Sequence, residues 1–503
     1  MTIQIPDWLE GVDALPGPKY KAIAQQIAAA VGSGALKPGD RLPPQRELAW
    51  ALECTVGTIS RAYAEAEKRG LLGGEVGRGT YVREEFEAAS SDSRGISGYW
   101  HSPSFEKAGE RVPSANDMDG IADWSPDMGP AERETGPIGL NHDYPPLGIE
   151  CLETARTMTE LSTDPVLMEM LSYQPHAGLG RHREAGAHWI ARRGIEATAD
   201  SVVVSTGAHN GVLATLSAIT RTGDVIAAEA LSYPGIKAIA GMLGLRIVPV
   251  TLDEEGLVPA ALDSLCRQQK IAALYTVPTL QNPTNAIMSE QRRREIADVA
   301  AKHGLPVVED DIFGMLAPES PPALATFLPD DLAFYVCSIS KTLAPGLRVG
   351  YVHGPRRQTA QIAAAIRTSS WMASPFTAEI STRWIENGAA DRILDSHSRE
   401  IETRRSMVLK AFDGFQVDCP PGALHAWVTL PSPWRVGELI AEAQTQGVIL
   451  PPTDSFMIGG GETPHAFRLS YCPPRHRSRL QEGLDAVLNL LNGTTRVEAA
   501  QVL

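Results

Sequence analysis

The sequence predicts a multidomain protein with an amino-terminal α+β winged helix-turn-helix, a large α/β part built on a mainly parallel sheet, and a smaller carboxyl-terminal α+β part. Residues 18–83 combine helical periodicity with a glycine-rich hairpin. Short apolar runs then alternate with helical stretches, as is typical of parallel sheets covered by helices. From about Ala378 onward helices dominate and strands are short. The predicted boundaries are 12–84 for the winged helix, 85–140 for a linker and 141–495 for the body, whose two parts span about 165–375 and 376–495.

Composition excludes several protein classes. The chain has 503 residues, of which 43% are hydrophobic and 21% charged, values ordinary for a globular protein. No apolar run approaches the roughly 18 residues of a membrane span. Residues 1–10 lack the basic and apolar regions of an export signal, so we expect a cytoplasmic protein without membrane contact. The six cysteines lie far apart without a CxxC pair, so we expect neither a disulfide nor a metal site.

The net charge of −15 is unevenly distributed along the chain. Residues 17–83 hold ten Lys+Arg and six Asp+Glu, a net charge of +4, which leaves −19 for the remainder. A basic module joined to an acidic body indicates that only the first part meets nucleic acid. This signal is weak alone, because +4 is also common on a solvated helical surface.

Three helices and a hairpin are predicted in the basic module. The first helix carries apolar residues at helical spacing from Tyr20 and ends near Gly32. The second follows two prolines, and the third begins at Thr55, a favourable N-cap, and stops at Gly70. The hairpin occupies residues 71–82 and has a glycine-rich tip. This order is that of a winged helix-turn-helix.

Three segments of this module resemble the GntR superfamily of bacterial winged-helix regulators. They are residues 36–49 (LKPGDRLPPQRELA), 58–63 (TISRAY) and 77–82 (GRGTYV). The resemblance implies operator DNA as a partner, with contacts to phosphates and base edges. The predicted DNA-binding residues are Arg46, Thr55, Thr58, Ser60, Arg61, Arg78 and Gly79. Val56 and Gly57 stand where the family usually has a polar or basic pair, so the bases that are read stay undetermined. Taken singly, Arg61 is equally well explained as a solvated side chain.

Beyond the linker, the apolar runs predict the strands of the body. Those of the large part are expected at residues 202–204, 225–228, 247–250, 271–276, 306–309 and 334–338, and those of the small part at 415–417, 426–430 and 467–469.

Residues 338–350 (SISKTLAPGLRVG) form the most informative motif in the chain. Lys341 lies just past a predicted strand end, between Ser338, Ser340 and a following Arg348. A lone lysine there would usually be a surface residue. In this setting its amine can form a Schiff base with an aldehyde cofactor, while the two hydroxyls and the arginine hold the phosphate of that cofactor.

Four other segments complete such a site in sequence order. Gly207, Ala208 and His209 open a helix after a strand and offer backbone N–H groups to a phosphate. Tyr233 can stack on a pyridine ring, and Asn282 can donate a hydrogen bond to a phenolate oxygen. Asp310 ends a buried strand and needs a cationic partner such as a pyridinium nitrogen, with Asp311 as the competing candidate. Each of these signals is weak alone; a Tyr-Pro pair, for example, is more often a plain turn.

Together these residues resemble a fold-type I aminotransferase bound to pyridoxal 5′-phosphate (PLP), nearest to the kynurenine and aminoadipate branch. The resemblance implies that Lys341 and Asp310 are catalytic and that Arg468, in FRLSY, grips an effector carboxylate. It also implies that Tyr173 reaches the phosphate of the neighbouring subunit in a homodimer. As a lone arginine on a strand, Arg468 could equally lie on the surface.

Two departures from the aminotransferase pattern bear on turnover. Phe313 replaces the tyrosine that usually follows the ring-nitrogen aspartate by three residues, which argues for slow or incomplete transamination. His209 stands where glutamine is common.

A GntR-type head on an aminotransferase-like body resembles the MocR/GabR family of PLP-dependent regulators. That resemblance implies a transcriptional regulator in which a small amino acid or amine reacts at Lys341 and alters DNA binding. Two alternatives stay open, namely an active aminotransferase with an accessory DNA-binding domain and a PLP-independent regulator with a vestigial body. The effector, the operator and the direction of regulation are not given by the sequence.

Overall fold

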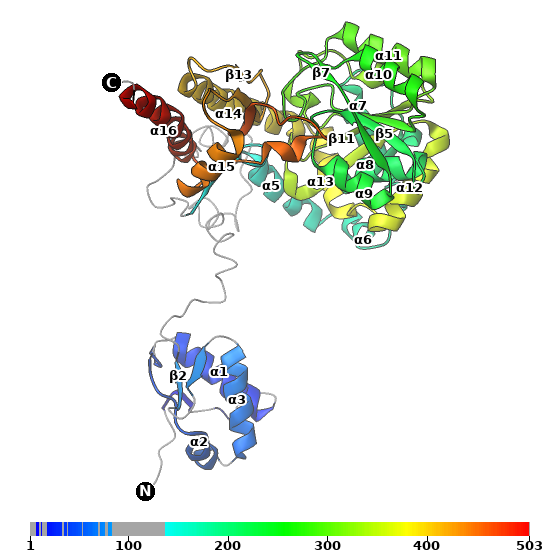
Figure 1. The fold of residues 1–503 in the computed structure, drawn as a ribbon. Helices are drawn as coiled ribbons and strands as arrows, with labels where there is room; N and C mark the ends of the chain where they lie inside the picture. The colour runs from blue at the N-terminus through cyan, green and yellow to red at the C-terminus, as the bar shows by residue number, and fades with distance from the viewer. Residues whose placement is uncertain are drawn as a thin grey trace. The chain divides into compact units, whose positions relative to one another are not determined.

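The computed structural model describes residues 7–9, 12, 18–32, 35–37, 39–52, 54–68, 71–75, 79–82 and 136–501. The chain divides into two units, Met1–Asp119 and Gly120–Leu503, and each is described by itself (Figure 1). Within the described ranges, no helix combines the length and apolar character needed to cross a membrane. The predicted linker lies outside these ranges except for residues 136–140.

The first unit contains a three-helix head with a two-stranded wing, as the sequence predicts. Its elements are α1 (Lys19–Gly32), α2 (Gln45–Ala51), α3 (Val56–Lys68), β1 (Leu72–Glu75) and β2 (Gly79–Val82), preceded by the short η1 (Asp7–Leu9). The two strands pair antiparallel, with Leu72 opposite Val82 and Glu75 opposite Gly79. Ile23, Ile59 and Leu72 are buried in one core that joins helices and wing, and this burial stabilises the arrangement.

The second unit is built on a seven-stranded sheet in the order β4-β12-β11-β10-β9-β5-β6. Its strands are β4 (Val202–Ser205), β5 (Val225–Glu229), β6 (Arg246–Val250), β9 (Ala273–Thr276), β10 (Val307–Asp310), β11 (Ala333–Ser338) and β12 (Gly350–His353). All neighbouring pairs are parallel except those made by β12, which runs antiparallel to both β11 and β4. The sequence analysis missed β12, because its four residues follow the lysine motif without an apolar run long enough to stand out.

Alternate residues of each strand enter two separate cores, one on each face of the sheet. On one face Val203, Ile226 and Val308 pack against α8 (Ala208–Ile219), α9 (Gly235–Leu243) and α12 (Arg356–Ser370). On the other face Val204, Ala227 and Val307 pack against α7 (Gly180–Ala191), α10 (Pro259–Gln268) and α11 (Glu290–His303). Helices on both faces explain why the strands read as continuous apolar runs rather than as alternating patterns.

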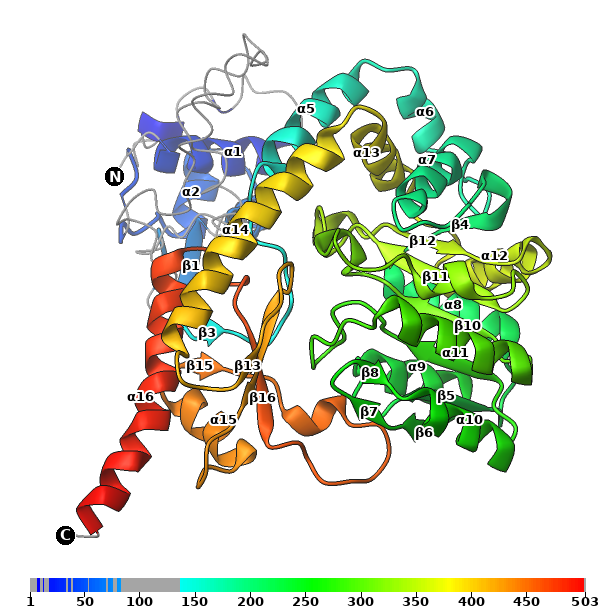
Figure 2. The same ribbon diagram turned by 90° about the horizontal axis from the view of Figure 1, so that it is seen from above.

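The remaining elements form the periphery and the smaller part of the body. They are β3 (Ile138–Gly139), α5 (Glu150–Ser162), α6 (Val166–Met170), β7 (Leu252–Asp253), β8 (Gly256–Leu257), α13 (Pro375–Glu386), α14 (Ala389–Ala411), β13 (Val417–Asp418), β14 (His425–Thr429), α15 (Val436–Thr445), β15 (Val448–Ile449), β16 (Ala466–Ser470) and α16 (Arg477–Gln501), with short 3-10 turns that include η7 (Pro345–Leu347) and η8 (Thr453–Phe456). β13, β14 and β16 form an antiparallel sheet, and β15 pairs parallel with β3. Figure 2 shows the long α14 running from α13 toward the small part, where it packs beside α16.

The predicted fold class is therefore confirmed. Most predicted strands agree with the structure to within two residues, whereas the strand expected at 415–417 lies at β13, Val417–Asp418. The divisions between linker, large part and small part stay predictions; α13, expected to open the small part, packs against α7 of the large part.

Candidate functional site

Several of the predicted site residues lie at the carboxyl-terminal edge of the parallel strands, where ligands bind in open α/β sheets. Asp310 is the last residue of β10, and Ser338 is the last residue of β11, three positions before Lys341. Gly207 follows β4 and caps α8. Asn282 lies in the turn after β9, and its bond to Pro283 is cis.

Lys341 is held by a segment that the sequence analysis did not assign to the site. Its Nζ donates a hydrogen bond to the backbone oxygen of Asp143, and the ring of Tyr144 lies 5.6 Å from it, measured to the ring centroid. Burial lowers the pKa of the lysine amine, and the positive charges of Arg468 and Arg348 act in the same direction. A lowered pKa increases the neutral, nucleophilic fraction of the amine at neutral pH.

A cradle for an anion lies between α8 and the turn that precedes β12. The side chain of Arg348 covers Gly207, so closely that a Cβ at this glycine would come within 2.7 Å of Arg348 Nη2. Arg348 itself adopts φ 52°, a strained conformation for a residue with a side chain. Ser338 Oγ and Ser340 Oγ are 2.9 Å apart, and Arg348 Nη1 lies 3.5 Å from Ser340 Oγ. These groups lie close to the first-turn N–H groups of α8, so together they could hold an anion such as a phosphate.

Asp310 and Asp311 have different environments, which bears on the alternative left open by the sequence. Asp311 Oδ2 accepts hydrogen bonds from Arg193 Nε at 2.7 Å and Tyr335 OH at 2.9 Å. Asp310 Oδ2 accepts from Tyr275 OH at 2.7 Å. The buried Oδ1 atoms of both aspartates have no partner among the described residues, so the cationic Arg193 is what distinguishes Asp311. Burial raises the pKa of Asp310 to about 7. The geometry favours Asp310 as the carboxylate that awaits a cationic partner.

Arg468 is buried on β16 and faces the same space. Its Nη1 donates to Asn282 Oδ1 and to Asp143 Oδ2, both at 2.9 Å, and its Nη2 donates to Asn141 O at 2.7 Å. Asn282 and Arg468, each predicted for the site in a separate role, are thus in direct contact. Asp143 was not predicted, and its pKa is held well below the ordinary value, because Arg468 and His425 outweigh the effect of burial.

Tyr233 and His209 lie together beside the cradle. Their rings make an edge contact with centroids 6.2 Å apart, and Tyr233 OH is 3.3 Å from His209 Nδ1. Burial lowers the pKa of His209, and the nearby Arg348 adds to this, so the imidazole is neutral at pH 7. Ala208 follows Gly207 as the first residue of α8.

Phe313 is buried and packs edge-on against His425, with ring centroids 6.4 Å apart. No phenol stands at this position, as the sequence indicates. Tyr275, whose hydroxyl is engaged by Asp310, does not replace it.

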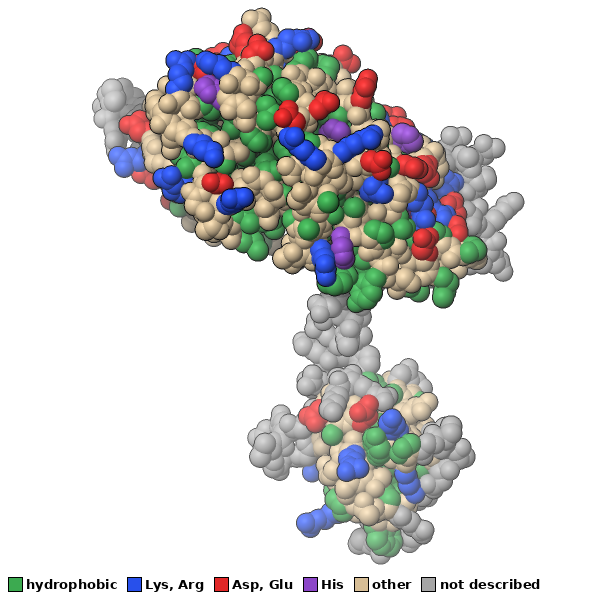
Figure 3. All heavy atoms as spheres, turned by 90° about the vertical axis from the view of Figure 1, so that its right-hand side faces the viewer, with side chains coloured by type: hydrophobic (Ala, Val, Ile, Leu, Met, Phe, Trp, Pro, Cys, Tyr) green, Lys and Arg blue, Asp and Glu red, His purple; other side chains and the backbone are tan. Residues whose placement is uncertain are grey.

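Tyr173 is 83% exposed and rests against Trp371, with ring centroids 6.0 Å apart. Met168 and Leu171 nearby are 74% and 76% exposed. Figure 3 shows that one face of the body carries charges of both signs, interspersed with apolar side chains. A cluster of large exposed apolar side chains marks an interaction surface.

The predicted DNA-binding residues of the head occupy different positions. Arg46 and Arg61 are exposed on α2 and α3. Thr55 caps α3, since its Oγ1 accepts from Thr58 N at 3.2 Å, and Ser60 Oγ donates to Gln45 Oε1 at 2.5 Å. Gly79 opens β2, and Arg78 lies outside the described residues.

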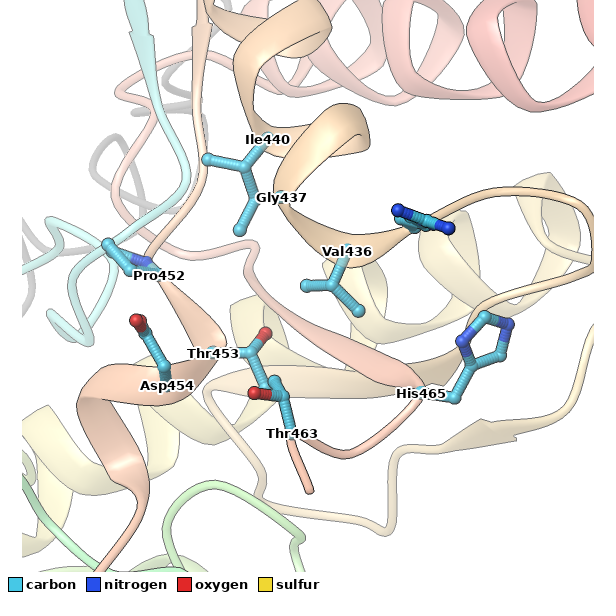
Figure 4. Close-up of a pocket in the computed structure, with 9 residues that line it drawn as sticks. Val436, Gly437, Ile440, Pro452, Thr453, Asp454, Thr463 and His465 are labelled. Atoms are coloured by element: carbon cyan, nitrogen blue, oxygen red, sulfur yellow. The ribbon is translucent and has the colours of Figure 1, made fainter. Parts of the chain in front are cut away.

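The sequence analysis missed Asn141, Asp143, Tyr275 and His425. Tyr275 was read as part of an apolar strand. The segment 141–144 has no periodic pattern and directly follows the predicted linker, so no signal marked it. A separate pocket of 510 Å³, which the sequence did not indicate either, lies in the small part between α15, η8 and the start of β16 (Figure 4). Val436, Thr453, Asp454 and His465 line it, and none of the predicted site residues does.

Comparison with known proteins agrees with both units. Residues 167–487 match the model of aminotransferase class I and II, and residues 19–82 match that of bacterial regulatory proteins of the gntR family. The chain is 30% identical over 490 residues to the uncharacterized HTH-type transcriptional regulator YdeF of Bacillus subtilis, covering 97% of both chains. It is 26% identical to the HTH-type transcriptional regulator TauR of Rhodobacter capsulatus, covering 89% of this chain and 92% of TauR.

Solved structures with the same fold include a kynurenine aminotransferase from Pyrococcus horikoshii, with a TM-score of 0.65 and 20% identity over 80% of this chain and 99% of that one. The α-aminoadipate aminotransferase LysN of Thermus thermophilus gives a TM-score of 0.64 at 22% identity, covering 78% of this chain and 98% of LysN.

Proposed function

The chain belongs to the class I and II aminotransferase family and joins that body to a gntR-type head, and from this we propose that it is a DNA-binding transcriptional regulator whose body holds PLP on Lys341 and senses a small amino compound. The relatives of similar length and domain order carry the names of transcriptional regulators, which supports this function. The single observation on which it depends is that Lys341 shares the sheet edge with a buried, half-unpartnered Asp310.

The residues fit PLP group by group. Arg348, Ser338, Ser340 and the first turn of α8 would hold the phosphate. Asp310 Oδ1 lacks a hydrogen-bond donor within the described part of the chain, and a protonated ring nitrogen supplies one. Asn282 Oδ1 accepts from Arg468, an orientation in which the Nδ2 group of Asn282 would donate to the ring oxygen. Tyr233 would lie against the ring.

When bound, PLP supplies an electrophilic carbon at which the Lys341 amine is exchanged for the amine of an effector. The chain's own residues prepare this exchange. The lowered pKa of Lys341 increases the neutral fraction of its amine, and Asp310 would accept a hydrogen bond from a protonated ring nitrogen. Phe313 provides no hydroxyl beside the ring oxygen, which supports sensing through one amine exchange rather than sustained transamination.

Residues 141–143, which follow the predicted linker to the head, take part in the site. Asp143 contacts both Lys341 and Arg468, Asn141 contacts Arg468, and both residues directly follow the predicted linker. An effector that changes these contacts acts on the segment that leads to the head. The coupling requires that the effector prefer one arrangement of the molecule to another.

We further propose a homodimer in which Tyr173 completes the site of the neighbouring subunit. Its exposure and its place beside Met168, Leu171 and Trp371 support this role, because the side chain is too exposed to serve its own site. The proposed operator contacts are those of α2, α3 and the wing, with Arg46 and Arg61 as the exposed cations.

Two variants test the PLP site and the DNA-binding site separately. Lys341→Ala removes the visible absorbance of lysine-bound PLP and the borohydride-dependent mass increase of the peptide that contains residue 341, while operator binding persists. Arg61→Ala retains the absorbance and weakens operator binding by at least tenfold, with a smaller salt dependence because a phosphate contact is lost. Lys410→Ala, an exposed lysine on α14, is the control and changes neither measurement.

A reduced linkage at a lysine other than Lys341, or a native protein without the chromophore, contradicts the PLP assignment. Continuous formation of glutamate from 2-oxoglutarate at ordinary enzyme rates would instead support the second candidate, an active aminotransferase, which the presence of Lys341, Asp310 and Arg348 favours.

A further inference from the structure

Asp143 contacts Arg468, the arginine that is expected to bind the carboxylate of an effector. Its Oδ2 accepts from Arg468 Nη1 at 2.9 Å, and its Oδ1 accepts from Ser470 Oγ at 2.7 Å. His425 Nδ1 is 3.3 Å from Oδ2. The backbone oxygen of the same residue accepts from Lys341 Nζ. One aspartate therefore contacts both the amine that would hold the cofactor and the guanidinium beside it.

These contacts use most of the hydrogen-bonding capacity of Arg468. A guanidinium grips a carboxylate best through two parallel N–H groups. Nη1 is shared by Asp143 and Asn282, and Nη2 is taken by the carbonyl of Asn141. Only Nε has no partner among the described residues. The position at Arg468 that an effector carboxylate is expected to take is therefore already occupied by the carboxylate of Asp143.

An effector carboxylate must either share Arg468 with Asp143 or displace Asp143 from it. Sharing places two negative charges against one arginine in a buried site. Displacement leaves the Asp143 carboxylate buried with Ser470 and His425 and without its guanidinium partner, and uncompensated buried charges are strongly unfavourable. An amine that carries no carboxylate meets neither penalty and approaches Lys341 with Asp143 in place.

We propose that Asp143 is a specificity-determining residue, because it occupies the carboxylate-binding position of Arg468. The site therefore selects amines that lack a carboxylate over amino acids. The inference rests on the proposed function, since it names the class of effector for that site. It assigns Arg468 to the internal pair in the native protein and leaves it free to bind a carboxylate once Asp143 is replaced.

The test uses two reagents that differ by one carboxylate, O-methylhydroxylamine and aminooxyacetate. The nitrogen of each attacks the carbon bound to Lys341 Nζ; a new C=N bond forms, the bond to Nζ breaks, and both protons of the reagent's NH2 group pass to the lysine nitrogen, which leaves as the free amine. No oxidant is required. The second-order rate constant is measured with the holoprotein by loss of visible absorbance, and calorimetry of acetate binding gives a readout that is independent of this exchange.

The quantity that decides is the ratio of the aminooxyacetate rate to the O-methylhydroxylamine rate. Asp143→Asn keeps the size of the side chain and removes its charge, and we expect this ratio to rise at least tenfold and acetate binding to become detectable. Asp331→Asn makes the same chemical change at an exposed residue of the body and leaves the ratio at its native value. If Asp143→Asn does not fold, Asp143→Ser replaces it.

A rise smaller than tenfold overturns the inference and shows the pair to be only structural. That result leaves the proposed function intact, because both reagents still bleach the chromophore. Failure of the proposed function has a different signature, in which the native protein lacks the visible band and neither reagent changes its spectrum.

Discussion

At the scale of single residues, the site is defined by charges placed without their usual partners. Asp310 is the strongest case, because one of its oxygens is buried without a donor in the described structure and its pKa rises to about 7. Asp143 is the opposite case, a carboxylate held charged by Arg468. Both carboxylates border the same lysine, so their charges set which molecules the lysine can meet.

The raised pKa of Asp310 predicts a pH-dependent stability for the cofactor-free protein. In the unfolded chain the carboxyl loses its proton near pH 3.9, whereas the folded protein retains it up to about pH 7. The free energy of unfolding therefore falls as pH rises through this window, by at most about 1.4 kcal/mol per pH unit from this residue.

Asp310→Asn cannot titrate and should become progressively more stable than the native protein between pH 4 and pH 7. Urea unfolding of both cofactor-free proteins at several pH values measures this difference. Asp331→Asn, at an exposed site, should show no such trend. A constant difference across the window would contradict the burial argument, and saturating PLP should remove the trend in the native protein.

At the scale of elements, the phosphate cradle depends on how closely α8 approaches the turn before β12. Gly207 has φ 81° and lies under Arg348. Gly350 allows the same approach from β12, since a Cβ there would come within 2.7 Å of the Gly207 carbonyl carbon. These two glycines explain why the cradle forms between an antiparallel strand and a helix terminus.

Gly207→Ala should weaken PLP binding by more than tenfold, because the methyl group would displace the Arg348 guanidinium from the cradle. Equilibrium titration of the cofactor-free protein with PLP measures the effect. Gly223→Ala is a matched control, since its φ is 91° but no atom lies within 4 Å of the added Cβ.

The control variant should lose about 1–2 kcal/mol of stability through backbone strain alone. It should keep the native affinity for PLP. Equal losses of affinity in both variants would show that strain, and not the position of Arg348, determines phosphate binding.

At the scale of the whole molecule, the proposed regulator needs two copies, because the exposed Tyr173 is expected to complete the site of the neighbouring subunit. Met168→Asp should dissociate the dimer and reduce PLP affinity together, since a charge is placed in the exposed apolar cluster. Analytical ultracentrifugation gives the oligomeric state, and the visible band gives bound PLP. Met242→Asp, at an equally exposed methionine on α9 (75% against 74%), should leave both unchanged.

The sequence alone determined the two-unit organisation, the head and most strands, because helical and strand periodicities and the spacing of GntR and lysine motifs are local properties. It also placed Lys341, Arg348, Gly207 and Asn282 in one site through their order. It missed β12, whose pairing with β4 and β11 is not visible in four residues.

Only the tertiary structure decided which partners each charge has. Adjacent residues at a strand end point in different directions. The sequence therefore does not distinguish the roles of Asp310 and Asp311, whereas the tertiary contact of Arg193 with Asp311 does. Asp143 and Arg468 are 325 positions apart, a contact that no local pattern encodes. Periodicity and motif spacing record what a residue's neighbours in the chain require, whereas the charge that a buried side chain meets is fixed by packing between distant segments.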